Sequence, residues 1–274
     1  MTSPANFFRT TEHADFYKKY RRGTPQKCIE KAIAFLAEKI DPKECIAIDI
    51  GCGSGQSSFP LSAYVKKVIG VDASEAQLAQ GRMDPMNVND VEFRLGSAEH
   101  IPVEDHSVHL IFGMHAAHWF DFEAFKKEVD RVLAPNGVLA LCSSDRKAIV
   151  VLGFEDEYNQ FFDQLIEETK SCWNEIAIQW SKFYEDAVLP YRCCIRDHSV
   201  EEEYEISVFN HIGYLRSMSG VAKYIEQDPV CGELLMNEAQ EKLMKMTKSS
   251  KGPEDTILKF KQGYILLLAR KPQI

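Results

Sequence analysis

Short apolar runs separated by polar turns follow one another along the first half of the chain. The run at 45–49 is continuous and β-branched, which is typical of a strand buried on both faces of a parallel sheet. Similar runs occur at 66–71 and 108–115. The segment 25–40 has apolar positions at helical spacing behind Pro25, and we expect an amphipathic helix that packs on the sheet.

The pattern changes after Ser144. Aromatic residues recur at helical spacing among many acidic ones from 145 to 191, and we interpret 145–200 as a helical insertion that caps the sheet. The other elements that the pattern predicts are strands at 91–96, 138–142, 200–206 and 263–271, and helices at 56–65, 74–83, 122–133, from 207, at 219–227 and at 232–247.

Composition fits one large α/β domain over residues 1–274, since 274 residues with 45% hydrophobic content can bury a sizeable core. The eight cysteines form no CxxC pair and no zinc spacing, so we expect reduced thiols and no metal. No basic leader with a long apolar stretch begins the sequence, and no 18-residue apolar run occurs. These features predict a cytoplasmic protein without membrane contact.

The net charge of −9 argues against a nucleic-acid partner, because phosphate binding depends on clustered lysines and arginines. The longest basic block, at 18–22, is typical of a solvated helix face. Composition therefore favours a small-molecule partner, and it carries no information on the oligomeric state.

Three glycines follow the first predicted strand, at Gly51, Gly53 and Gly55. Glycines let the backbone turn tightly and approach a ligand closely, and the N–H groups at the start of the next helix face the same loop. Gln56 stands where a dinucleotide fingerprint requires glycine, which opposes an NAD(P)-dependent oxidoreductase. Asp72 ends the second strand 21 residues after Gly51, the spacing of an acidic partner for ribose hydroxyls.

These motifs resemble a known family. AIDIGCGSG followed by VIGVDAS is similar to the first two motifs of S-adenosylmethionine (SAM) dependent methyltransferases with a Rossmann-like fold, and AAHWFDFEAF at 116–125 and YLRSMSG at 214–220 resemble the trans-aconitate methyltransferase-like subgroup. Tyr17 and Arg21 ahead of Pro25 match that subgroup's N-terminal pattern. The resemblance implies a Rossmann-like, seven-stranded, mostly parallel sheet with an antiparallel last strand, helices on both faces and a helical cap.

The resemblance also implies a SAM site, with S-adenosylhomocysteine as product. In the family, the residues after the third strand lie beside the adenine ring, and the N-terminal tyrosine and arginine lie near the methionine carboxylate, which suits a guanidinium. The cofactor residues predicted on this basis are Tyr17, Arg21, Asp49, Gly51, Cys52, Gly53, Gly55, Asp72, Ala73, Ser97, Ala98 and Glu99.

The loop after the fourth strand is dense in polar aromatic residues. Ligands of open α/β sheets bind beyond the carboxyl ends of the strands, so we expect this loop to face the transferred methyl. His115 and His118 are candidate general bases, with an ordinary pKa near 6.5; the alternative is that both only line the pocket. Trp119 is expected in the pocket wall, and Asp121 is expected to cap the next helix.

The expected reaction is SAM-dependent methylation of a small molecule, with O-methylation of a small organic carboxylic acid suggested by the subgroup. Its segment at 214–220 borders the acceptor, which makes Tyr214, Arg216 and Ser217 candidate contacts. Arg216, together with Arg192 or Arg196, could orient a carboxylate. N- or S-methylation of an amine or thiol is the alternative, and a catalytically silent SAM-binding protein is the hypothesis from another class.

Overall fold

The computed structural model describes residues 19–20, 22–87, 91–174 and 180–273. Seven strands in these ranges form one sheet in the order β3-β2-β1-β4-β5-β7-β6. Their bounds are β1 Ile46–Ile50, β2 Lys67–Asp72, β3 Glu92–Leu95, β4 Val108–Met114, β5 Leu133–Val151, β6 Cys194–Ser207 and β7 Ile257–Arg270. Strands β1 to β5 pair in parallel and β7 runs antiparallel between β5 and β6. The predicted Rossmann-like sheet is confirmed.

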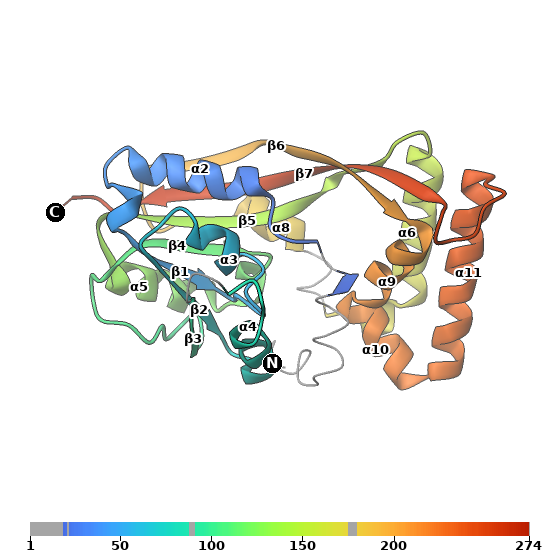
Figure 1. Cartoon of the computed structure of the whole chain (residues 1–274), viewed down its shortest axis with the longest axis horizontal. Coiled ribbons are helices and arrows are strands. Elements are labelled where there is room, and N and C mark those ends of the chain that lie inside the picture. The colour runs from blue at the N-terminus through green and yellow to red at the C-terminus, as the bar shows by residue number, and fades with distance from the viewer. Residues whose placement is uncertain (1–18, 21, 88–90, 175–179, 274) are drawn as a thin grey trace.

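Helices cover both faces of the sheet (Figure 1). Successive residues of β1 point to opposite faces, and Ala47 packs with α2 while Ile48 packs with α5 and α8. The helices in this part are α2 Gln26–Ala37, α3 Ser58–Ser62, α4 Glu75–Arg82, α5 Phe122–Val132 and α8 Trp180–Asp186.

A separate helical lobe lies at the far ends of the three long strands β5, β6 and β7, where Figure 1 shows α6, α9, α10 and α11 gathered together. Its apolar core joins the helices to Val151 of β5 and to Leu258 and Phe260 of β7. The helices of the lobe are α6 Glu155–Glu168, α9 Val208–Arg216, α10 Ser219–Gln227 and α11 Pro229–Thr247.

The predicted bounds of the helical cap, 145–200, differ from the structure at both ends. Strand β5 continues to Val151, because after a register shift its β-branched residues 149–151 pair with β7. Strand β6 already begins at Cys194. The helical lobe draws three of its four helices from residues beyond 207, so it is built from two separate stretches of sequence.

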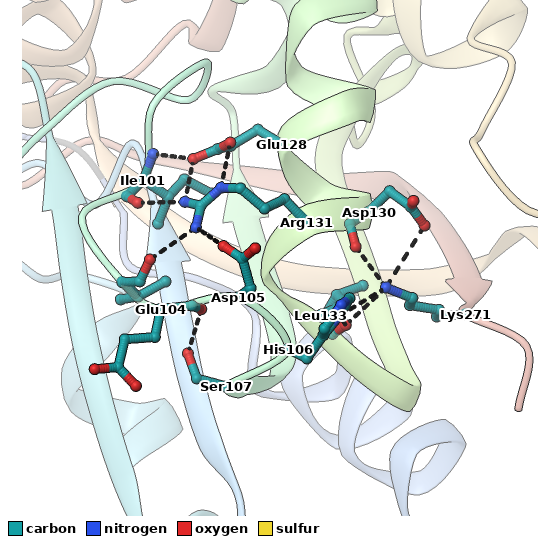
Figure 2. A network of polar contacts seen from close by, with 11 residues as sticks. Ile101, Glu104, Asp105, His106, Ser107, Glu128, Asp130, Arg131, Leu133 and Lys271 are labelled. Atoms are coloured by element: carbon teal, nitrogen blue, oxygen red, sulfur yellow. Dashed lines mark hydrogen bonds and ion pairs between the residues drawn. The ribbon is translucent and has the colours of Figure 1, made fainter. Parts of the chain in front are cut away.

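Two basic residues, the half-buried Arg131 and the buried Lys271, connect α5 to its surroundings (Figure 2). Arg131 donates to the carbonyl oxygens of Ile101 and Val103, both at 2.9 Å, and binds Glu128 through two nitrogens. Lys271, after the end of β7, donates to the carbonyl oxygens of Asp130 and Leu133 where α5 ends. Arg131 therefore fixes the loop that follows residues 97–99.

Candidate functional site

One cavity of about 370 Å³ lies between the carboxyl ends of the parallel strands and the helical lobe. Its volume is in the range of small-molecule sites. The lining combines the glycine loop with aromatic residues from the other side, and it includes Gly51, Cys52, Gly53, Asp72, Ala73, Ser97, Ala98, Glu99, His115, His118, Trp119, Trp173, Tyr204, Tyr214 and Ser217. Most of the residues predicted at the cofactor and at the acceptor are thus brought to one cavity.

The three loop glycines have left-handed backbones, with φ of +68°, +55° and +93° at Gly51, Gly53 and Gly55. A Cβ at Gly51 would lie 2.5 Å from the Cβ of Ala116, so this position requires glycine for packing. A Cβ at Gly53 would meet only the Gln77 side chain, at 3.7 Å. The space beside Gly53 is a cradle that a side chain would fill, and it fits a ligand that approaches the backbone.

Asp72 joins the end of β2 to the glycine loop. Its carboxylate accepts hydrogen bonds from the N–H groups of Gly53, at 2.9 Å, and Ser74, at 2.8 Å. Burial raises the pKa of Asp72 above its ordinary value. The carboxylate lines the cavity beside Ala73, where it is available to the hydroxyl groups of a ribose.

Asp49 lies beneath the loop rather than in the cavity lining. Its Oδ2 accepts a hydrogen bond from the Ser58 hydroxyl at 2.6 Å, and burial raises its pKa to about 7. The bond ties the end of β1 to α3, so Asp49 supports the loop from below. Cys52 is buried and lines the cavity, and burial raises the pKa of its thiol.

The turn after β3 forms another wall of the cavity. Ser97, Ala98 and Glu99 all belong to its lining. Glu99 also accepts a hydrogen bond from the N–H of Asp121 at 2.9 Å, which links this turn to the start of α5. The side chain of Asp121 accepts from Ala124 N–H at 3.1 Å, so the predicted helix cap is confirmed.

His115 and His118 follow β4 and both line the cavity. His115 has a left-handed backbone with φ of 54°, and its Nδ1 lies 3.0 Å from the Ser143 hydroxyl. The Nδ1 atom of His118 is buried and has no hydrogen-bond partner among the described residues. Burial, and to a lesser extent the neighbouring His115, lowers the pKa of His118 to about 3. The His118 ring is therefore neutral at physiological pH, with a nitrogen left for a ligand.

Trp119 completes this loop with its ring centroid 5.1 Å from that of His118. The centroid of the Tyr184 ring lies 6.0 Å from that of His118. The Tyr184 hydroxyl accepts a hydrogen bond from Ala117 N–H at 3.2 Å. His118 thus packs with two aromatic rings, one from its own loop and one from α8.

Only some of the residues predicted to contact the acceptor line the cavity. Tyr214 and Ser217 line the cavity, whereas Arg216 does not. Both terminal nitrogens of Arg216 bind Glu233, at 2.5 and 2.7 Å. Because α9 places Arg216 on the face toward α11, its guanidinium is paired away from the cavity.

The other predicted basic residues are also absent from the described part of the lining. Arg196 donates to the carbonyl oxygens of Tyr184 and Ala187, at 3.2 and 2.9 Å, and Arg192 is not among the lining residues. Tyr17 and Arg21 lie outside the described residues.

Several lining residues were missed by the sequence-based prediction: Arg22, Thr24, Trp173, Tyr204, Gln262 and Tyr264. The sequence pattern could have identified Gln262, since it is a polar residue at the edge of the apolar run of β7. It could not have identified Arg22, because the position of Arg22 depends on contacts with strand β6, 180 residues further along the chain.

Outside this cavity, three side chains could hold a metal ion. Asp145, Glu185 and His198 each bring one ligand atom within 4.8 Å of the others. The group is partly exposed and does not belong to the cavity lining. None of the helices in the described ranges combines the length and the apolar run that crossing a bilayer requires.

Comparison with known proteins matches residues 48–141 to a family described as a methyltransferase domain. A Dictyostelium discoideum protein named as a methyltransferase is 31% identical over 235 residues, which is 83% of each chain. The solved structure of a type II methyltransferase from Anaeromyxobacter dehalogenans has a TM-score of 0.70 at 24% identity, over 92% of this chain and 99% of that one.

A more distant structure shows the same fold with ligands bound. A phosphoethanolamine N-methyltransferase 2 of Haemonchus contortus, in complex with phosphomonomethylethanolamine and S-adenosylhomocysteine, has a TM-score of 0.50 at 16% identity, over 100% of this chain and 61% of that one.

Proposed function

Because the chain belongs to the SAM-dependent methyltransferases, we propose that it transfers the methyl group of SAM to a small organic molecule bound in the aromatic half of its cavity. The observation that carries the proposal is the continuity of that cavity. Gly53 and Asp72 at one end share it with Trp173 and Tyr214 at the other. Donor and acceptor can therefore lie side by side in this cavity.

The residues of the chain act mainly by positioning. SAM supplies a methyl group on a cationic sulfur, and alignment of two bound reactants can provide about 7 kcal/mol or more of the acceleration. Under the proposal, Asp72 and the glycine loop hold the cofactor, and Ser97, Ala98 and Glu99 border its adenine. Tyr214 and Ser217 then contact the acceptor opposite His118.

His118 fits a role in orienting the nucleophile. A general base is most effective at neutral pH when its pKa is near 7, whereas burial lowers the pKa of His118 to about 3. Its unpartnered Nδ1 can instead form a hydrogen bond with the acceptor. His115, which contacts Ser143, is then a second lining residue.

The class of acceptor follows from the charges at the cavity. A carboxylic acid remains a candidate, but the arginines expected to orient it, Arg216, Arg192 and Arg196, are not in the described lining. An uncharged nucleophile has more support, because Arg22, which does line the cavity, is already paired with Glu202 at 3.1 Å. We therefore propose a hydroxyl, amine or thiol group as the methylated site of a small molecule.

The test is transfer of labelled methyl from SAM into a small-molecule extract, followed by treatment with mild alkali. We expect alkali-stable label in the small-molecule fraction, and much less of it with the Asp72→Ala variant when SAM is subsaturating. Label released as methanol would identify a methyl ester, and a carboxylic acid would then be the favoured methyl acceptor. Cofactor binding without transfer to any acceptor would support the catalytically silent protein and contradict the proposal.

A further inference from the structure

A group of polar and aromatic side chains forms the part of the cavity bounded by β6 and β7. Gln262 and Tyr264 of β7, Tyr204 of β6 and Arg22 all line the cavity. Glu202 of β6 pairs with Gln262 across the ladder, which puts both side chains on the same face of the sheet. We call these five residues the strand-face subsite.

Two of its hydrogen-bond donors are already engaged. Nη2 of Arg22 and the hydroxyl of Tyr264 both donate to Oε2 of Glu202, at 3.1 and 3.4 Å. The Arg22 guanidinium also lies 3.5 Å from the centre of the Tyr204 ring. The carboxylate of Glu202 therefore neutralises the positive charge of the subsite and uses the tyrosine hydroxyl.

Gln262 differs from these residues. It is 8% exposed, and its Nε2 is buried without a hydrogen-bond partner among the described residues. Buried polar groups in proteins are nearly always paired, and an amide nitrogen can only donate. A ligand oxygen that accepts a hydrogen bond from Nε2 would give Gln262 the partner that the described residues do not supply.

The position of Gln262 along β7 separates it from the loop that carries His115. Tyr264 pairs with Ser144 of β5, the neighbour of Ser143, which contacts His115. Gln262 lies two residues further out on the same strand, about 7 Å away at the rise of an extended chain. A single ring spans that distance, and Trp173 lines the same cavity.

We propose that Gln262 is a specificity-determining residue which donates a hydrogen bond to an uncharged carbonyl oxygen on the methyl acceptor, at the end remote from the methylated atom. This proposal rests on the proposed function and narrows its substrate class to neutral, ring-containing carbonyl compounds. A carboxylate is disfavoured at this end, because it would lie beside the carboxylate of Glu202, opposite Gln262.

The test compares two phenols that differ at one position. 4-Hydroxyacetophenone carries a carbonyl oxygen where 4-ethylphenol carries a methylene group. Their Kd values are measured by calorimetry on the full chain saturated with S-adenosylhomocysteine. We expect the wild type to bind the ketone about tenfold more tightly, as one well-made hydrogen bond allows. In Gln262→Leu and Gln262→Met, which keep a side chain of similar size, the two Kd values become about equal.

The matched control is Gln160→Leu, on the exposed surface of α6, which should keep the wild-type ratio. Affinity for S-adenosylhomocysteine should be the same in all four proteins, which shows that the cavity is intact. A ketone preference that survives in both Gln262 variants overturns the proposal, and so does a wild type without preference or without binding of either phenol at millimolar concentration.

A third probe separates charge from hydrogen bonding. If 4-hydroxybenzoate binds more tightly than the ketone and loses that advantage in Arg22→Ala, the subsite recognises a carboxylate and the proposal is wrong. These are binding measurements without turnover. A ketone preference that depends on Gln262 would support the role of this residue even if no methyl transfer to any acceptor were found. The absence of transfer would then contradict only the proposed function.

Discussion

At the scale of single residues, the proposed cofactor half of the site depends on one carboxylate. Asp72 accepts from two backbone N–H groups that belong to different segments, Gly53 in the loop and Ser74 at the cap of α4. The spacing from Gly51 predicted this residue, because strand, loop and strand end are local features. Its neighbour Asp49 was also predicted at the cofactor, but the structure puts it below the loop, where only the packing of α3 could reveal it.

Asp72→Ala should weaken SAM binding by about 2 kcal/mol, the scale of a hydrogen bond to a charged group. The reason is the loss of the carboxylate at the cavity, and calorimetric titration with SAM measures it. Asp41→Ala is the matched control, since Asp41 also accepts from the N–H two residues ahead, at 3.0 Å, but lies outside the cavity. Equal SAM affinity in the wild type and in Asp72→Ala would refute the assignment.

At the scale of elements, the glycine loop combines two different requirements. Gly51 needs the absence of a side chain for packing against Ala116, whereas Gly53 borders open space. Gly153 provides a reference, because its φ is +86° and a Cβ there would meet nothing within 4 Å. Alanine at Gly153 therefore measures the cost of backbone strain alone. Alanine at Gly51 adds a packing clash to that cost, and alanine at Gly53 adds an obstacle to the ligand.

Gly153→Ala should lower the free energy of unfolding by about 1 kcal/mol, the cost of a left-handed backbone. Gly53→Ala should cost the same stability but weaken SAM binding, since its Cβ enters the cradle. Gly51→Ala should be the least stable of the three because of the added clash. Urea unfolding and SAM titration give both quantities; undiminished SAM affinity in Gly53→Ala would contradict the proposed cradle.

The helical lobe contains a second neutral histidine, which makes its stability depend on pH. Burial lowers the pKa of His211 to about 3, and its Nε2 lies 2.9 Å from the Tyr158 hydroxyl, which joins α9 to α6. The unfolded chain has an ordinary histidine pKa near 6.5. Below that pH the unfolded state binds a proton that the folded state does not bind. The free energy of unfolding therefore falls as the pH drops from 6.5 toward 3.

Between pH 7 and pH 5 the wild type should lose about 2 kcal/mol more unfolding free energy than His211→Gln, which retains a partner for Tyr158 but does not titrate. Chemical unfolding at the two pH values measures the difference. The exposed His100 serves as control, and His100→Gln should follow the wild type. Parallel pH dependence in the wild type and His211→Gln would contradict a neutral His211.

At the scale of the whole molecule, the parallel half of the sheet and the single helices α9, α10 and α11 of the lobe were predictable, but the packing of the lobe was not. Continuous apolar runs and turn glycines are local signals, and they identified β1 to β5. The pairing of Arg216 with Glu233 depends on how α9 packs against α11, and the position of Gln262 depends on the register between β6 and β7. Sequence periodicity predicts elements but not such contacts, so most of the acceptor half became visible only in the structure.

Lys271 connects the end of the last strand to α5 (Figure 2) and does not belong to the cavity lining. Its side chain is 3% exposed, and its Nζ donates to the Leu133 carbonyl oxygen at 2.9 Å. Lys271→Met should lower the free energy of unfolding by about 1 to 3 kcal/mol, because buried carbonyl groups lose their donor. SAM affinity should not change. Lys251→Met, at an exposed position, is the control; equal stability of the two variants would contradict the anchoring role.

The central claim is that one cavity holds the methyl donor at the glycine loop and the acceptor at the strand face. A crystal structure of the protein with S-adenosylhomocysteine and 4-hydroxyacetophenone tests it most directly. We predict the ribose at Asp72, the adenine beside Ser97, and the ketone oxygen within hydrogen-bond distance of Gln262 Nε2, with the phenol toward His118. Cofactor density elsewhere, or a ketone oxygen turned away from Gln262, would contradict the account.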